Sequence, residues 1–295
     1  MAPPTPDAMQ FCYSATFSSP AELVPLAQAG DQAGWSTLTV SDHLINPVET
    51  RSTYPYTKDG ARRWEMGTPW PDPWVTVGHL AAVTTRLRFL TTVYILPART
   101  PVHVAKQVGT AAVLSGNRVD LGIGMGWMEE EFDAMGTPFA KRGKRADEMI
   151  EVLRKLWTGE VVEHHGEHFE VPALEMLPAP TAPVPIVVGG LSEAALRRAA
   201  RNDGWVSDFH TIAELGEIRH RIEGYREEYG RTDVPFAMYG SAKDAWDLDG
   251  YRRLADAGVT HLVTMPWYFY AGADADLAGK IDGITRFADD IIAKW

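Results

Sequence analysis

Short apolar runs rich in β-branched residues alternate along the chain with longer segments of helical period. Apolar residues that recur every three or four positions indicate amphipathic helices, and the short runs between them indicate buried strands. This alternation is typical of parallel strands joined by crossover helices. The eight predicted strands are residues 9–13, 37–40, 88–93, 119–123, 186–188, 204–207, 236–239 and 261–265.

Eight strand–helix units in a chain of 295 residues predict a closed (β/α)8 TIM barrel, forming a single domain over residues 1–295. An open doubly wound sheet is the alternative. The helical period is clearest in residues 145–157 and again in residues 277–291. Pro101 after Thr100 is typical of a helix start, and so is Ser192.

Two segments interrupt this rhythm. Residues 42–72 follow the second strand, and residues 158–183 follow the helix of the fourth unit. Long loops inside compact domains are often lids or binding segments. We therefore expect loop insertions after strands 2 and 4.

The charge and the cysteine content narrow the class of protein. A formal net charge of −11 disfavours nucleic acid or an anionic membrane as the main partner. The single cysteine, Cys12, leaves no internal disulfide, which fits a reducing cytoplasm. Residues 1–7 lack the pattern of a secretory signal, and no apolar run approaches the ~20 residues that cross a bilayer. We expect a cytoplasmic protein.

Polar residues and glycines gather where the predicted strands end, which is where a TIM barrel carries its chemistry. Glycine at a strand end costs stability, and close approach of a flat ligand to the backbone is one reason for it; an ordinary tight turn is the other. The segments concerned are Ser41-Asp42-His43, Thr91-Thr92-Val93-Tyr94, Gly122-Ile123-Gly124-Met125-Gly126-Trp127, Gly189-Gly190, Ser207-Asp208 and Met265-Pro266-Trp267.

Several segments together carry a family resemblance. They are TTV at 91–93, PVHVAKQ at 101–107, LSGNR at 114–118, LGIGMGW at 121–127, LWTG at 156–159 and PIVVGG at 185–190. In combination they resemble the bacterial luciferase-like superfamily over nearly the whole chain. The chain is most similar to the actinobacterial branch that uses the deazaflavin coenzyme F420 rather than FMN.

The resemblance implies a flavin or deazaflavin ring in the barrel mouth, and a homodimer. It also implies a non-prolyl cis peptide at Thr92–Val93 that supports the ring. An Asp-His pair follows the second strand in the superfamily's glucose-6-phosphate dehydrogenases, and Asp42-His43 matches it. Their glutamate acid after the fourth strand is replaced here by Trp127, and we find no lysine and arginine set for a sugar phosphate.

His43 is the predicted catalytic residue, because histidine exchanges protons near neutral pH and this one follows a strand at the mouth. If His43 is not the proton donor, the remaining candidates are Glu129, Asp208 and bound water. Gly189-Gly190 precedes a helix N-terminus, which favours a phosphate. The predicted cofactor-binding residues are Asp42, Thr92, Val93, Gly124, Met125, Gly126, Gly189, Gly190 and Asp208.

Three other clusters have simpler interpretations. The histidines of residues 164–168 suggest a metal, but adjacent histidines do not share a face and the segment looks like a hairpin, so we predict no metal site. The acidic run of residues 129–131 suits the N-terminus of the next helix. The positive excess over residues 51–63 is either a solvated loop or a site for the glutamate tail of F420.

The sequence therefore predicts an F420-dependent oxidoreductase that transfers a hydride between the deazaflavin and a small organic substrate. An FMN-dependent luciferase-like monooxygenase is the second hypothesis. A barrel that binds the cofactor without catalysis is the third.

Overall fold

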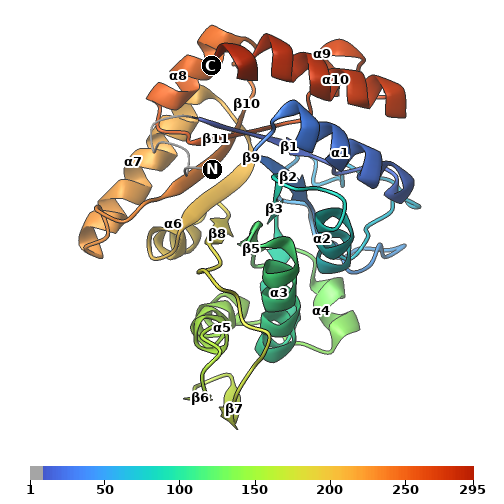
Figure 1. Ribbon diagram of the computed structural model, residues 1–295. Coiled ribbons are helices and arrows are strands. Elements are labelled where there is room, and N and C mark those ends of the chain that lie inside the picture. Colours follow the sequence, from blue (N-terminus) through green and yellow to red (C-terminus); the bar gives the residue numbers. More distant parts are fainter. Residues whose placement is uncertain (1–8) are drawn as a thin grey trace.

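The computed structural model describes residues 9–295, in which eight parallel strands close into a barrel (Figure 1). The strand order is β3-β2-β1-β11-β10-β9-β8-β5, and β5 pairs back with β3. The closed barrel is confirmed, and the open sheet is wrong. The strands are β1 (Gln10–Ser14), β2 (Thr37–Val40), β3 (Arg88–Thr91), β5 (Val119–Gly124), β8 (Ile186–Gly189), β9 (Gly204–His210), β10 (Ala237–Ala242) and β11 (His261–Thr264).

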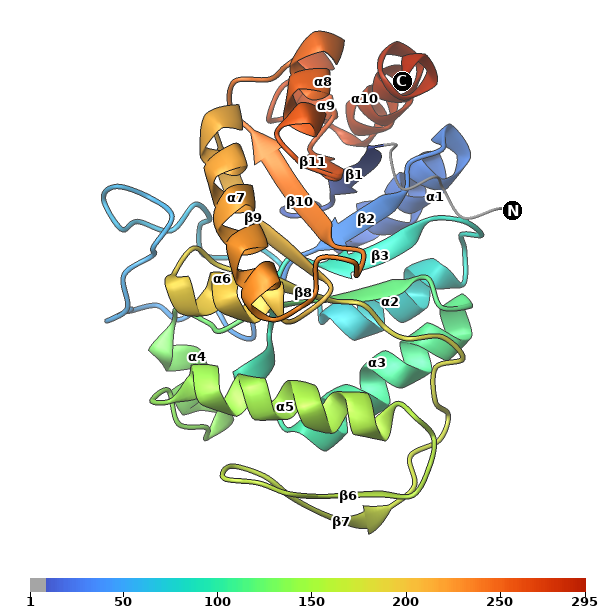
Figure 2. The same ribbon diagram turned by 90° about the vertical axis from the view of Figure 1, so that its left-hand side faces the viewer.

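Helices surround the barrel because each buries one apolar face against the strands (Figure 2). Ser192 caps its helix by accepting a hydrogen bond from the N–H of Ala195 at 3.2 Å. The long helices are α1 (Leu23–Ala33), α2 (Pro73–Ala81), α3 (Pro101–Ser115), α5 (Arg142–Leu156), α6 (Glu193–Ala200), α7 (Ile212–Glu228), α8 (Leu248–Asp256) and α10 (Leu277–Asp290). The short ones are α4 (Glu129–Met135) and α9 (Trp267–Tyr270), with 3-10 turns at Pro20–Glu22, Leu96–Ala98 and Ile292–Lys294.

The two insertions lie in different places. The loop after β2, light blue in Figure 2, lies with α4 on one side of the barrel. The second insertion forms the predicted hairpin, β6 (Val162–His165) with β7 (Glu170–Leu174). Glu148 of α5 accepts hydrogen bonds from the N–H groups of His168 and Phe169, so the hairpin packs on the outside of α5. It does not cover the mouth, because α5 separates it from the strands.

The third strand is interrupted near its end. β3 and the short β4 (Tyr94–Ile95) both pair with β5, and between them lies the cis peptide bond Thr92–Val93. The predicted cis bond is confirmed. The N–H of Thr92 donates to the carbonyl of Val40 at 2.7 Å, and the hydroxyl of Ser41 donates to the carbonyl of Thr92 at 3.1 Å. The bulge is therefore tied to the end of β2.

The barrel interior is apolar toward the mouth and charged toward its opposite end. Cys12 is fully buried with Leu90, and burial raises the pKa of its thiol to about 12. At the N-terminal ends of the strands, Arg88 and Asp120 form an ion pair at 2.5 Å. No helix of residues 9–295 combines the length and the apolar character needed to cross a membrane.

His261, at the start of β11, couples the stability of the barrel to pH. Its ring lies 4.1 Å from that of Tyr239, and burial together with the charge of Arg88 lowers its pKa to about 4. An unfolded histidine titrates near 6.5, so the unfolded state binds the proton first as the pH falls. This contribution to stability is complete above about pH 6.5 and is lost as the pH falls toward 4.

The free energy of unfolding of the wild type should decrease between pH 6.5 and pH 4. We predict that this decrease is smaller by about 1–3 kcal/mol in His261→Gln. Urea unfolding at several pH values measures this. His220→Gln, at an exposed position on α7, is the matched control and leaves the pH dependence unchanged. Identical pH profiles for the wild type and His261→Gln would contradict the prediction.

Candidate active site at the barrel mouth

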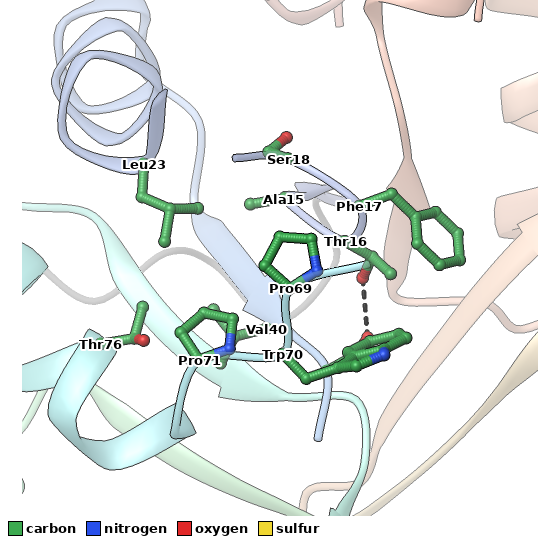
Figure 3. A pocket seen from close by; sticks show the side chains of 11 residues that line it. Ala15, Thr16, Phe17, Ser18, Leu23, Val40, Pro69, Trp70, Pro71 and Thr76 are labelled. Atoms are coloured by element: carbon green, nitrogen blue, oxygen red, sulfur yellow. Dashed lines mark hydrogen bonds between the residues drawn. The ribbon is translucent and has the colours of Figure 1, made fainter. Parts of the chain in front are cut away.

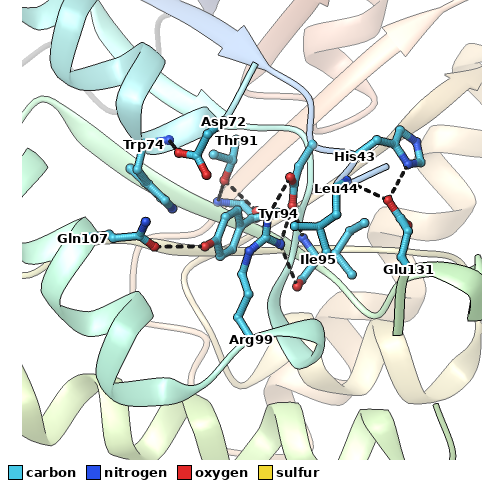
Figure 4. A network of polar contacts seen from close by, with 12 residues as sticks. His43, Leu44, Asp72, Trp74, Thr91, Tyr94, Ile95, Arg99, Gln107 and Glu131 are labelled. Carbon is cyan, nitrogen blue, oxygen red and sulfur yellow. Dashed lines mark hydrogen bonds and ion pairs between the residues drawn. The ribbon is translucent and has the colours of Figure 1, made fainter. Parts of the chain in front are cut away.

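A buried ion pair links the end of β2 to the segment after the bulge (Figure 4). Both carboxylate oxygens of Asp42 accept hydrogen bonds from Arg99, at 2.7 and 2.8 Å. The N–H of Ile95 donates to Asp42 at 2.8 Å, and the guanidinium lies 3.9 Å from the ring centroid of Tyr94. Asp42 is only 5% exposed. Its carboxylate therefore supports the bulged strand, and its predicted contact with a cofactor stays a prediction.

Three glycines make room for the bulge. A Cβ atom on Gly122 would lie 1.9 Å from the carbonyl oxygen of Thr91, and one on Gly124 would lie 2.4 Å from the side chain of Val93. A Cβ atom on Gly189 would also meet Val93, at 2.9 Å. Gly124 and Gly189 are needed because the Val93 side chain packs against both, and Gly122 is needed because the backbone carbonyl of Thr91 lies beside it. The closest neighbours of these glycines are thus the Thr91 carbonyl and the Val93 side chain, and a contact with a flat ligand stays a prediction.

His43 lies at the mouth, and its imidazole contacts a buried carboxylate. Its Nδ1 is 3.0 Å from Oε1 of Glu131, which is fully buried and also accepts a hydrogen bond from the N–H of Leu44 at 2.8 Å. A carboxylate accepts, so Nδ1 carries the proton and Nε2 is the nitrogen left for other partners. The second oxygen of Glu131 is buried without a hydrogen bond to any of residues 9–295.

Aromatic rings enclose His43. The rings of Trp64 and Trp70 lie 4.6 and 4.8 Å from the imidazole, and that of Trp127 lies at 6.2 Å. Tyr54 contacts both Trp64 and Trp127. The indole N–H groups of Trp64 and Trp70 are buried, and neither donates to another described group. Trp64 and Trp70 of the loop after β2, together with Trp127 after β5, thus surround the imidazole and leave the His43 side chain 10% exposed.

Charged contacts hold this loop over the mouth. Arg63 pairs with Asp208 of β9 at 2.5 Å, and Arg51 pairs with Asp133 of α4 at 2.7 Å. Glu130 accepts hydrogen bonds from Ser52 and from the N–H of Arg51; although burial opposes it, these bonds lower the pKa of Glu130 to about 2. The loop contacts α4 and β9 together.

These contacts bear on two predictions. One is that the loop binds the glutamate tail of F420, and the other is that Asp208 binds the cofactor. Arg62 donates to Asn46 at 2.6 Å, so three of the loop's four cationic side chains already have partners within the protein. Arg51 and Arg63 are thus paired with carboxylates and Arg62 contacts a neutral amide, and binding of a glutamate tail by this loop stays a prediction. Asp208 is held by Arg63, so any contact with a cofactor would compete with this ion pair.

The remaining predicted residues lie at the strand ends around the same opening. Gly126 has a φ of +73°, and its carbonyl accepts from Arg142 at 3.0 Å. Met125 is partly buried and packs against the core. Gly190, with a φ of +114°, precedes the capped N-terminus of α6. Their roles toward a cofactor stay predictions.

Sequence reasoning missed Glu131, Trp64 and Trp70. The acidic run was assigned to a helix N-terminus, where Glu129 and Glu130 do lie. The third residue of the run turns inward, because the first turn of α4 has one buried face. The available signal for a buried cluster was the presence of two tryptophans in one long loop, because tryptophan side chains are highly buried on average.

Comparison with known proteins identifies a family and several relatives. The family model described as luciferase-like monooxygenase matches residues 3–267. An uncharacterised protein of Mycobacterium tuberculosis is 44% identical over 290 residues, covering 97% of this chain and 100% of that protein. An F420-dependent glucose-6-phosphate dehydrogenase of Nakamurella multipartita is 28% identical over 301 residues, covering 97% of this chain and 81% of that enzyme.

Two solved structures show the same fold. The F420-dependent tetrahydromethanopterin reductase of Methanopyrus kandleri aligns with a TM-score of 0.75 at 15% identity, covering 97% of this chain and 99% of that one. A Baeyer–Villiger monooxygenase from a Pseudomonas putida plasmid, in complex with FMN, aligns with a TM-score of 0.63 at 18% identity, covering 94% and 83%. With the family model matched along nearly the whole chain, this protein belongs to the luciferase-like monooxygenase family.

Proposed function

We propose that this protein is a coenzyme F420-dependent oxidoreductase that transfers a hydride between the deazaflavin and a small organic substrate. The observation that carries the proposal is the pairing of His43 with Glu131 inside an aromatic cage at the barrel mouth. The family membership and the F420-dependent relative support the choice of cofactor. An FMN-dependent monooxygenase is the second candidate, favoured by the FMN-bound neighbour.

The mouth has the features that such a cofactor needs. The bulge at Thr92–Val93 lies between β3 and β4, at the C-terminal end of the third strand. Gly190 leads into the N-terminus of α6, whose unpaired N–H groups suit a phosphate. The buried indole N–H groups of Trp64 and Trp70 can donate to a polar heterocycle. When bound, the deazaflavin supplies or accepts a hydride at the carbon that replaces N5 of a flavin.

The protein's own part in the reaction is to move a proton. Hydride removal from an alcohol requires the loss of the hydroxyl proton, and the reverse reaction requires its return. Nε2 of His43 is the atom placed to do this, because Glu131 holds Nδ1. The tryptophans exclude water from the imidazole, so that the proton passes between substrate and histidine. Asp42 keeps the neighbouring backbone in place through Arg99.

The cofactor preference is tested by titration. We expect the purified protein to bind F420 at micromolar concentration and more tightly than FMN, measured by fluorescence and by calorimetry. Oxygen consumption with reduced FMN provides the opposing assay. Tighter binding of FMN, together with substrate-dependent oxygen uptake, would replace the F420 proposal with the monooxygenase.

The proton-transfer role is tested with His43→Ala and Glu131→Gln. His43→Ala should keep near-normal F420 affinity and slow single-turnover hydride transfer by about 10²–10⁴-fold, with one ionisation missing from its pH profile. Glu131→Gln keeps the shape of the side chain but not its charge, so it should slow the same step by a smaller factor and alter the pH profile.

Cofactor affinity is measured separately for both variants. His220→Gln serves as a histidine control away from the mouth. A His43→Ala enzyme that binds F420 weakly but reacts at the normal rate once saturated would make His43 a binding residue instead. An unchanged pH profile in Glu131→Gln would remove Glu131 from the mechanism.

A further inference from the structure

An ion pair spans the barrel mouth. β2 and β9 stand on opposite sides of the barrel, because three strands separate them in either direction around the closed sheet. Arg63 belongs to the loop that follows β2, and Asp208 lies near the end of β9. The two side chains approach to 2.5 Å and are 37% and 25% exposed. The pair therefore joins one wall of the mouth to the opposite wall.

This ion pair lies beside the aromatic residues that surround His43. Arg63 directly precedes Trp64, whose ring is 4.6 Å from the imidazole, and its guanidinium lies 5.8 Å from the ring centroid of Tyr54. Tyr54 in turn contacts Trp127, which follows β5. The loop, β5 and β9 thus meet around His43. A ligand that enters the mouth has to pass this contact.

The end of the loop is fixed to the barrel. Trp70 stands between Pro69 and Pro71, and proline restricts the backbone. The Trp70 ring packs against that of Phe17 at 5.7 Å, beside a small recess that these four residues help to line (Figure 3). Trp70 therefore keeps its place when other parts of the loop move.

The start of the loop is fixed as well. The hydroxyl of Ser52 donates to Glu130 of α4 at 2.8 Å and accepts a hydrogen bond from the N–H of Glu129 at 2.9 Å. Arg62 is tied to this part of the loop through Asn46, at 2.6 Å. An opening of the ion pair to β9 would thus leave both ends of the loop attached.

Residues 53–63, which we call the strap, hold their own shape between these anchors. The N–H of Tyr54 donates to the carbonyl of Gly60 at 3.1 Å, and the guanidinium of Arg63 donates to the carbonyl of Tyr56 at 2.8 Å. Neither bond involves β9, so the ion pair opens without unfolding the strap. A partly exposed ion pair is also weak, which suits a contact that opens often.

We propose that Arg63 and Asp208 form a latch across the barrel mouth, which opens to admit the cofactor and closes again over it. The closed latch shields the bound ring from water, and the open latch lets it leave. The latch rests on the proposed function, because a cofactor bound in the mouth is what it controls. It acts on a flavin and on a deazaflavin alike.

Stopped-flow fluorescence, with F420 and FMN as separate probes, measures the association and dissociation rates. Arg63→Gln removes the latch and should raise both rate constants by about two- to fivefold. The equilibrium affinity should stay nearly unchanged, because the latch closes over the free and the occupied mouth alike. A role of Arg63 in holding the cofactor would instead weaken the affinity.

Lys58→Gln is the matched control. It removes the same charge from the strap, at an exposed position for which the structure shows no ion pair with any of residues 9–295. Both probes are anionic, so the loss of a positive charge by itself slows association. Lys58→Gln should therefore change association in the opposite direction to Arg63→Gln. Slower or unchanged association in Arg63→Gln overturns the latch.

The partner residue gives an independent check. Asp208→Asn should raise both rates as Arg63→Gln does, and the double variant should add nothing further, since either substitution already opens the latch. Additive effects of the two substitutions would contradict the proposal.

Hydrogen exchange of the cofactor-free protein tests the latch without any ligand. The backbone amides of residues 53–63 should exchange faster in Arg63→Gln than in the wild type or in Lys58→Gln, while those of α2 keep their rates. Equal exchange of the strap in all three proteins overturns the latch.

The two proposals fail separately. Tighter binding of FMN than of F420 refutes the proposed cofactor, and the FMN rates then test the latch. Tight binding of F420 at rates that Arg63→Gln does not change refutes the latch and keeps the cofactor. If neither probe binds, the cofactor proposal fails and hydrogen exchange alone decides on the latch.

Discussion

The buried ion pair between Asp42 and Arg99 is the interaction on which the barrel mouth depends. It joins the end of β2 to the segment that follows the bulge, and it is supported by the N–H of Ile95 and by the ring of Tyr94. Breaking such a pair leaves one charge buried without compensation, at a cost of about 3–5 kcal/mol. The pair fixes the backbone at Ile95, while Thr92 is held by Val40 and Ser41 at the end of β2.

The position of His43 follows from the same constraint. It is the residue next to Asp42, so the ion pair places its backbone, and Glu131 then sets the orientation of its ring. Glu131 reaches the histidine because α4 begins shortly after β5 ends. The Val93 side chain could not pack where it does without Gly124 and Gly189 beside it. Bulge, glycines and histidine therefore form one arrangement.

The loop after β2 completes the site by covering it. Its tryptophans supply apolar contact to the imidazole, while Arg51 and Arg63 pair with Asp133 and Asp208. Part of the positive charge that the sequence places in this loop is thus balanced within the protein, and the tryptophans form the wall next to His43.

The sequence by itself determined the barrel and its strands, because periodicity is a local feature. It also located His43 and, through the family resemblance, the cis peptide at Thr92–Val93. Only the tertiary structure decided that Glu131 pairs with His43, 88 positions away, and that Arg63 pairs with Asp208. It also placed the second insertion outside α5. These contacts join residues far apart in the chain, and their formation depends on loop conformations that no local pattern encodes.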